Sequence, residues 1–375
     1  MLAATPAGTA FAVGSGDPLQ GQEWFLDNVG AEQASPPGPG VPLTIVDSGV
    51  DSGQPDFAGR PNTTYLNDQT VTGPGEFHGT EIASVAAAPA NGIGIVGVYP
   101  QAALDVWDAT PSPAGIDGGV AAAGIRAAPC PGVINLSFGA DARDPRLEDA
   151  IASAQRRGCL VVAAAGNLAE QGNPVVYPAA DLHVLAVGAS DQTDARASFS
   201  SFGPWVDVLA PGVGIQVDTT VEHDPSGAAV DDGTSFSSAI VAAAAAWIWT
   251  ERRTLSAAQI EELVRATAQN SVLDIPAALA APAPPNDPRE PNDTIAEAAA
   301  EPALTTRAHP ANRIAATLDA TKDPRDFYRI YKPPHARIRL SVTGGVVARV
   351  VGSYVEVTLP PGAADARYVL GVRSS

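Results

Sequence analysis

The segment GTSFSSA, Gly233 to Ala239, contains a serine that could act as a nucleophile. It introduces an almost unbroken run of small apolar residues ending at Trp249, which predicts a buried helix. The first turn of a helix presents free backbone N–H groups and the positive end of the helix dipole. Those groups would stabilise an oxyanion on a carbonyl that Ser235 attacks. The plainer interpretation is that a serine at this place only caps the helix.

A nucleophilic serine needs a base for its proton, an acid that orients the base, and donors for the oxyanion. Asp47 ends the apolar run VPLTIVDSG, His78 opens the helix-like run HGTEIASVAAA, and Asn167 ends the run LVVAAAGN. Each has an ordinary alternative, which is a turn residue for Asp47 and Asn167 and a helix-terminal histidine for His78. Catalysis in open α/β sheets gathers at the carboxyl edge of the strands, so the four residue types together favour a catalytic serine site.

These residues lie in a region, from about Val41 to Ala280, where short apolar runs alternate with helix-period segments. The runs are nearly continuous in apolar residues, which predicts an α/β fold with a parallel sheet and helices on both faces. One helix is expected around Leu147–Ala154 and ends at Gly158, and Ser256 with Gln259 forms a capping box for another. The expected strands are VPLTIVDSG, ALDVWDA, VINLSFG, LVVAAAGN, HVLAVGAS and WVDVLAPG.

The composition changes at Ala281, where a proline-rich polar segment predicts a semi-rigid linker. Beyond it, apolar and polar residues alternate in three segments, which predicts a small antiparallel β-sandwich domain. The alternating segments begin near Ile338, Val355 and Tyr368. The expected organisation is a flexible segment over residues 1–16, an α/β domain over 17–280, a linker over 281–291 and a β domain over 292–375.

Composition restricts the partners of the chain. It has 375 residues, of which 45% are hydrophobic, and a formal net charge of −19. Nucleic acids and anionic membrane surfaces attract Lys and Arg, so this charge argues against both as partners. No apolar stretch reaches the ~18 residues that a membrane helix needs. We expect a monomer that acts on polypeptides, and residues 1–16 show no secretory signal.

Two cysteines, Cys130 and Cys159, each stand just before a predicted strand. If those strands are parallel neighbours, their starting ends lie side by side and a disulfide is geometrically feasible. The alternative is two partly buried free thiols. The sequence leaves both open, and a bridge would contribute roughly 3 kcal/mol of stability.

Six ordered motifs resemble the subtilisin-like serine peptidases over about Asp17 to Ala280. They are VPLTIVDSGVDSGQPDF, HGTEIASV with NGIGIVGV, INLSFG, VVAAAGN, FSSFGPWVDVLAPG and DDGTSFSSA. They occur in the chain order of that family, with Asp first, then His, then Ser. The resemblance implies Asp47, His78 and Ser235 as the catalytic triad. It implies the Asn167 amide and the Ser235 N–H as oxyanion donors.

A protein of this kind is expected to be a secreted or extracytoplasmic serine endopeptidase. Only some sixteen residues precede Asp17, which is too few for the usual folded pro-segment. A catalytically silent relative that serves as a scaffold or adhesion protein is the alternative function. The acid-active serine-carboxyl peptidases share the fold, but they use a glutamate base where this chain has His78.

The resemblance also implies a substrate cleft with two walls and a pocket floor. One wall would pair with an extended peptide by strand addition. The pocket is expected to be narrow and apolar, and to accept Leu, Ala or Met before the cleaved bond. The residues are Ser137, Phe138 and Gly139 for the first wall, Ala164, Ala165 and Gly166 for the second, and Val176 for the floor.

Three positions depart from the family pattern around the triad. Glu81 follows HGT where the family often has histidine, Phe236 replaces the common methionine, and Ala239 stands where proline is usual. None of the three removes a catalytic group. They are expected to affect local packing and the start of the helix more than activity.

A structural calcium site is a second implication of the resemblance, although no cofactor is required for the chemistry. Calcium prefers carboxylate, amide and backbone carbonyl oxygens. Asp17, Asp56 and Asn91 match the side-chain ligands of relatives. The backbone carbonyls would come from near Pro89, Ile93 and Ile95. The alternative is that all are ordinary turn residues.

The tail has its own resemblance. EPNDT, RIAATLDATKDPRDFYRIY, RIRLSV and RYVLGV look like the pre-peptidase C-terminal domain of secreted bacterial peptidases. That resemblance implies an accessory role in stability, secretion or substrate adhesion. We identify no catalytic constellation in this part of the sequence.

Overall fold

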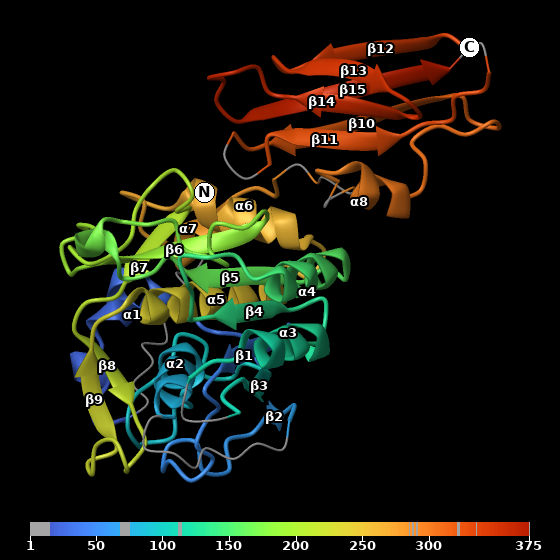
Figure 1. Ribbon diagram of the computed structural model, residues 1–375. Helices are drawn as coiled ribbons and strands as arrows, with labels where there is room; N and C mark the ends of the chain where they lie inside the picture. Colours follow the sequence, from blue (N-terminus) through green and yellow to red (C-terminus); the bar gives the residue numbers. More distant parts are fainter. Residues whose placement is uncertain are drawn as a thin grey trace, which may run out of the picture.

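The computed structural model describes residues 16–67, 76–111, 115–284, 286, 289, 292–320, 323–334 and 336–374. Its centre is a seven-stranded parallel sheet in the order β2-β3-β1-β4-β5-β6-β7 (Figure 1). The strands are β1 (Leu43–Asp47), β2 (Thr63–Tyr65), β3 (Leu104–Asp108), β4 (Val133–Leu136), β5 (Leu160–Ala164), β6 (Val184–Ser190) and β7 (Val208–Pro211). The segment expected to be flexible, residues 1–16, lies outside the described residues except for Gly16.

Each of the six expected strands contains an observed strand, which confirms the parallel sheet. The strands β1, β4 and β5 are buried along their whole length, as the continuous apolar runs indicate. The edge strand β2 was not anticipated. Its sequence TTY is only three residues long and largely exposed, so it carries no apolar run.

Helices cover both faces of the sheet. Along β1, Leu43 and Ile45 pack with α2 (His78–Ala87) and α5 (Thr234–Glu251), whereas Val46 packs with α3 (Gly118–Ala127) and α4 (Pro145–Arg156). In Figure 1, α5 is drawn behind β4 and β5, whereas α3 and α4 lie next to each other at the right. A period of two along β1 therefore divides its side chains between two cores.

The helix α5 is the central element of the larger core. Fifteen of its eighteen residues are buried, so it is apolar on every side rather than amphipathic. It contacts β4, β5, β6 and β7 as well as α2. The burial confirms the helix expected from the apolar run after Ser235. Among the described residues, no helix combines the length and apolar character that crossing a membrane requires.

The other expected helix signals also hold. The capping box of Ser256 and Gln259 begins α6 (Ala257–Thr267), and Gly158 follows the end of α4 with a φ of 86°. The antiparallel hairpin of β8 and β9 was not anticipated. The remaining bounds are β8 (Ile215–Asp218), β9 (Ala228–Asp231), α1 (Trp24–Asn28), α7 (Ile275–Ala280), η1 (Gln20–Gln22), η2 (Ala31–Gln33) and η3 (Ala169–Gln171).

Cys130 and Cys159 form a disulfide, with their Cα atoms 5.1 Å apart. The bridge joins the segments that lead into β4 and β5, which pair in parallel from Val133 opposite Leu160. Of the two alternatives that the sequence left open, the structure has the bridge. It closes a loop across one crossover of the sheet.

The C-terminal part contains two antiparallel three-stranded sheets, ordered β10-β15-β12 and β11-β14-β13 (Figure 1). Side chains of both sheets, including Leu370 of one and Val355 of the other, belong to one buried cluster. The three alternating segments lie in β12, β14 and β15. The bounds are β10 (Ala311–Leu318), β11 (Arg325–Arg329), β12 (Ile338–Thr343), β13 (Val347–Val351), β14 (Tyr354–Thr358), β15 (Ala366–Ser374) and α8 (Ile295–Ala300), which contacts β11.

Candidate active site

Asp47 is the last residue of β1 and is 1% exposed. Its Oδ1 accepts a hydrogen bond of 2.7 Å from the Ser48 N–H and lies 2.8 Å from His78 Nδ1. With that carboxylate beside it, Nδ1 carries the proton and Nε2 is left as the basic nitrogen. The arrangement therefore fixes the tautomer that a general base needs.

His78 is the first residue of α2, and the helix start is fastened to the loop after β1. The Gly79 N–H donates to Ser48 Oγ at 2.9 Å. A Cβ at Gly79 would lie 2.1 Å from the Gly49 carbonyl oxygen, so only glycine permits this close approach. The approach places the imidazole directly beside Asp47.

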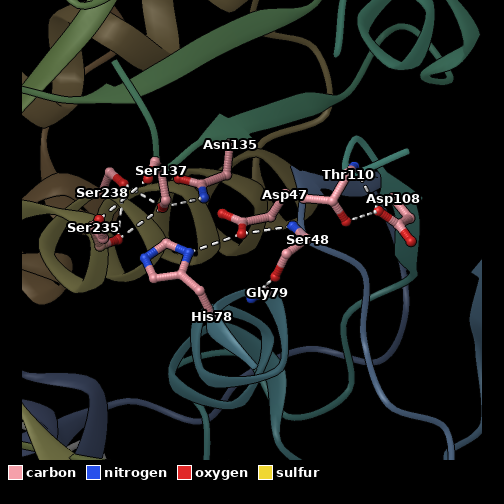
Figure 2. Close-up of polar contacts among 10 residues, drawn as sticks. All are labelled: Asp47, Ser48, His78, Gly79, Asp108, Thr110, Asn135, Ser137, Ser235 and Ser238. Atoms are coloured by element: carbon pink, nitrogen blue, oxygen red, sulfur yellow. Dashed lines mark hydrogen bonds and ion pairs between the residues drawn. The ribbon is translucent and has the colours of Figure 1, made fainter. Parts of the chain in front are cut away.

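Ser235 lies in the first turn of α5 and is partly exposed. Figure 2 shows the His78 imidazole between Asp47 and Ser235. The Ser235 hydroxyl donates to the Ser137 carbonyl oxygen at 3.2 Å, and no hydrogen bond joins it to His78 in the described part of the chain. Catalytic contacts are often loose before substrate binds. A rotation about χ1 of Ser235 would bring its hydroxyl towards the imidazole.

Asn167 follows β5 and faces the start of α5. Its Oδ1 accepts hydrogen bonds from the Thr234 N–H at 3.0 Å and the Thr234 hydroxyl at 2.9 Å. With the oxygen held by the helix start, the amide NH₂ group is left to donate elsewhere. Asn167 is exposed, so that group is accessible to a substrate. The first-turn N–H of Ser235 also lacks an intrahelical acceptor.

The charges around His78 favour its protonated form. Burial lowers the pKa of His78, but the charge and hydrogen bond of Asp47, with the charges of Glu81 and Asp231, raise it above its ordinary value of 6.5. Glu81 is fully buried in α2, and burial raises its pKa to about 7. A proton accepted by His78 is thus stabilised by three carboxyl groups.

A polar network behind Ser235 was not found from the sequence. The Ser137 hydroxyl donates to the Ser235 carbonyl oxygen at 2.9 Å and lies 2.9 Å from Ser238 Oγ, while the Asn135 amide donates to Ser137 Oγ at 2.8 Å (Figure 2). The motif INLSFG contains two of these residues, and that was the available signal. The network links the end of β4 to the first turn of α5 and so fixes the position of Ser235.

Two of the residues expected to line the specificity pocket, Gly139 and Gly166, lie against Val176. A Cβ at Gly139 would lie 2.6 Å from Val176 Cγ1, and a Cβ at Gly166 would lie 2.8 Å from Val176 Cγ2. The Val176 side chain therefore lies between Gly139 and Gly166. Next to this region, a surface hollow is lined by Phe138, Leu147 and other side chains.

Asp17, Asp56 and Asn91, the residues expected to bind calcium, lie close together. Asp17 Oδ1 accepts from the Asn91 N–H at 3.2 Å, and the Asn91 amide donates to the Asp56 carbonyl oxygen at 3.2 Å. Both carboxylate oxygens of Asp56 are buried and accept no hydrogen bond from the described residues. Asp218, which the sequence did not single out, lies beside Asp56 across Gly94.

A second group of ligand-type side chains lies at the junction with the C-terminal part. One atom each from His183, Asp293 and Asp323 lie within 4.8 Å of one another. Two of the three already form an ion pair, since His183 Nε2 lies 2.6 Å from Asp293 Oδ2. No sequence pattern predicts this group, because its members come from distant segments.

The chain is similar to known proteins over its α/β part. Residues 38–295 match the peptidase S8 subtilase family. Subtilisin BL from Lederbergia lenta is 37% identical over 237 residues, which cover 62% of this chain and 84% of that protein. Subtilisin DY from Bacillus licheniformis is 35% identical over 238 residues, covering 62% and 85%. A solved structure described as a cold adapted subtilisin-like serine proteinase has a TM-score of 0.57 and 26% identity, covering 68% and 94%.

Proposed function

The chain belongs to the subtilase family and is a serine-type endopeptidase, and from this premise we propose that Asp47, His78 and Ser235 are its catalytic triad. The observation that carries the proposal is the 2.8 Å contact between the buried Asp47 carboxylate and His78 Nδ1, beside the start of α5. Asp47 and His78 are already in contact, and Ser235 lies on the opposite side of the imidazole (Figure 2).

Each step of the reaction uses a group already described. Nε2 of His78 accepts the proton of the Ser235 hydroxyl as the oxygen attacks the peptide carbonyl. Asp47 holds the imidazole and stabilises its charged form. The Asn167 amide and the Ser235 N–H donate to the oxyanion. His78 then protonates the leaving amine, and water activated by the same imidazole hydrolyses the acyl-enzyme.

We propose a shallow apolar specificity pocket with Val176 as its floor. The contacts of Val176 with both walls support a preference for small and medium neutral residues, such as Ala, before the cleaved bond. Val176→Gly should widen the pocket and raise kcat/KM for substrates with Phe at this position, by about 10-fold for the apolar surface gained. A peptide library cleaved mainly after Arg or Lys would contradict the proposal.

We propose that calcium binds at Asp17, Asp56 and Asn91, and the buried carboxylate of Asp56 supports it. Burial raises the pKa of Asp56 to about 6 and that of the neighbouring Asp218 to about 9, which marks a site that lacks positive charge. A hard divalent cation would supply that charge and stabilise the fold. Chelation by EDTA should therefore lower the unfolding temperature, and an unchanged temperature would count against the ion.

We propose that the C-terminal part is a β-sandwich resembling the pre-peptidase C-terminal domain and that its role is accessory. We also propose that the protein is an extracytoplasmic monomer. The two antiparallel sheets around one apolar cluster support the sandwich. The disulfide supports the location, since such bonds persist mainly in oxidising compartments. Deletion of residues 292–375 should leave peptide hydrolysis intact if the role is accessory.

The test of the triad is hydrolysis of casein or a chromogenic peptide by the full chain and by Ser235→Ala and His78→Ala. Each substitution should reduce kcat by at least about 10⁴-fold, because the triad acts as a unit. Unchanged activity in Ser235→Ala would contradict the assignment. Activity confined to low pH would instead favour chemistry with a carboxyl base.

A further inference from the structure

Glu81 is a buried carboxyl group one helical turn after His78. It is 0% exposed, and its Oε1 accepts a hydrogen bond of 2.8 Å from the Thr219 hydroxyl, just beyond β8. Its Oε2 is buried and has no hydrogen-bond donor among the described residues. Residues three apart on a helix share a face, with roughly 5–6 Å between their Cβ atoms. Glu81 thus lies on the His78 side of α2.

The elements that pack against α2 contribute few ionisable groups near Glu81. These elements are α5, β8 and β1. α5 has no ionisable side chain before Glu251, and Asp218 of β8 faces Asp56 instead. The charges that act on Glu81 are those of His78 on its own helix, Asp47 at the end of β1 and Asp231 at the end of β9.

His78 is therefore the one group among these that can carry a positive charge. Burial raises the pKa of Glu81 to about 7, although the Thr219 hydrogen bond and the charge of His78 lower it. The charge of Glu81 in turn raises the pKa of His78. Each group therefore favours the charged form of the other.

We propose that Glu81 is a positioning residue of the catalytic centre, whose buried negative charge acts through His78 to stabilise the imidazolium formed when Ser235 gives up its proton. The inference rests on the proposed function of the triad. Asp47 holds Nδ1 directly, whereas Glu81 acts on the ring from within the helix that carries it. Ionisation of the Glu81 carboxyl adds a second negative charge near His78 as the pH rises towards neutrality.

The test is Glu81→Gln, which removes the charge but keeps an oxygen that can accept from Thr219. In the full chain, kcat and KM should be measured from pH 5 to 9 with an uncharged peptide. Loss of the charge lowers the pKa of His78, so the acid limb of kcat/KM should move to lower pH by about 0.3–1 unit. Above pH 8, kcat should fall about 3–10-fold with KM unchanged.

Two further variants separate charge from structure. Thr219→Val keeps Glu81 but removes its hydrogen-bond donor, which raises the pKa of Glu81. The carboxyl is then neutral over more of the acid limb, so the limb should move in the same direction by a smaller amount. Glu222→Gln removes an exposed charge from the β8–β9 turn and should leave the profile unchanged.

The outcomes distinguish this inference from the proposed function. An acid limb that stays in place in both Glu81→Gln and Thr219→Val overturns the role of Glu81 alone. A uniform loss of kcat at every pH, with a lower unfolding temperature, also overturns it, because that marks a purely structural residue. Activity that survives Ser235→Ala overturns the triad, and the inference with it.

Discussion

The hydroxyl of Ser235 points to a backbone carbonyl and not to its proposed base. Its contact with the Ser137 carbonyl oxygen, at 3.2 Å, is weak and is lost when the side chain turns towards His78. The imidazole and the carboxylate are already aligned at 2.8 Å. At the residue scale, the proposed triad therefore needs a rotation of the Ser235 side chain to become reactive, while Asn167, the proposed oxyanion donor, is held through Thr234.

Replacement of Asn167 by leucine tests the oxyanion donor. Asn167→Leu removes the amide NH₂ group without removing bulk. We expect kcat to fall roughly 10²–10³-fold, the size known for this asparagine in a subtilisin, with KM little changed. Steady-state kinetics on one chromogenic peptide would measure both constants. A variant with an unaltered kcat would show that Asn167 does not contact the oxyanion.

The pH dependence of activity tests the environment of His78. The base must be neutral to accept a proton, and its pKa is raised above the ordinary 6.5 by Asp47, Glu81 and Asp231 against the effect of burial. We therefore expect kcat/KM to be low in acid and to rise with pH through a midpoint above 6.5. A midpoint well below 6 would contradict the charges assigned around the imidazole.

At the scale of elements, the site depends on how closely β1, α2 and α5 approach one another. The loop after β1 meets the start of α2 at Gly79, whose missing Cβ makes room for the Gly49 carbonyl. The end of β4 meets α5 through Ser137. Each contact fixes one member of the proposed triad by backbone or buried hydroxyl groups, which tolerate little displacement.

Gly79→Ala tests the approach of β1 and α2. The new Cβ would meet the Gly49 carbonyl oxygen at 2.1 Å, so backbone must move and His78 with it. We expect kcat/KM to fall about 10²-fold, since a displacement of 1 Å costs that much, and stability to fall by about 1–3 kcal/mol. Gly21→Ala is the matched control, because nothing lies within 4 Å of its Cβ.

The sequence was enough to predict the buried strands, the central helix and the position of each proposed catalytic residue at an element's end. Long apolar runs such as that of β5 leave few alternatives to a covered strand. The contact of Ser238 with Ser137 was not predicted, because it joins residues 101 positions apart. Short or exposed elements such as β2 were also not predicted, because their sequences have little apolar pattern.

At the scale of the whole molecule, the α/β part and the C-terminal part are joined by more than the chain. His183 precedes β6 and lies 2.6 Å from Asp293, which precedes α8 and is 6% exposed. Arg265 of α6 also contacts Asp319, which follows β10, at 2.6 Å. These ion pairs hold the C-terminal sheets against the side of the α/β part that carries α6 (Figure 1).

The pair of His183 and Asp293 predicts a pH-dependent attachment. Burial raises the pKa of Asp293, but the hydrogen bond and charge of His183 bring it below its ordinary 3.8. A lowered pKa contributes stability that is fully present above the ordinary pKa of the carboxyl group and is lost as the pH falls through the lower value of the folded state. His183→Asn keeps a residue that tolerates the local φ of 53°. It should therefore lower the unfolding temperature at pH 6 more than at pH 3.

A loss of equal size at both pH values would contradict the role of this ion pair. Arg146→Gln serves as the control, since its pairing with Asp144 is exposed and lies within the α/β part. It should change the unfolding temperature little at either pH. Limited proteolysis between residues 280 and 292 would report whether the C-terminal part has separated.

The most direct test of the account is to label the full chain with a fluorophosphonate, which reacts only with an activated serine, and to locate the adduct by mass spectrometry. We predict one adduct, on Ser235, formed faster as the pH rises above 6.5 and abolished in both Ser235→Ala and His78→Ala. The control Glu222→Gln should react like the parent. No adduct on folded protein, or an adduct on another serine, would contradict the assignment of Ser235 as the nucleophile.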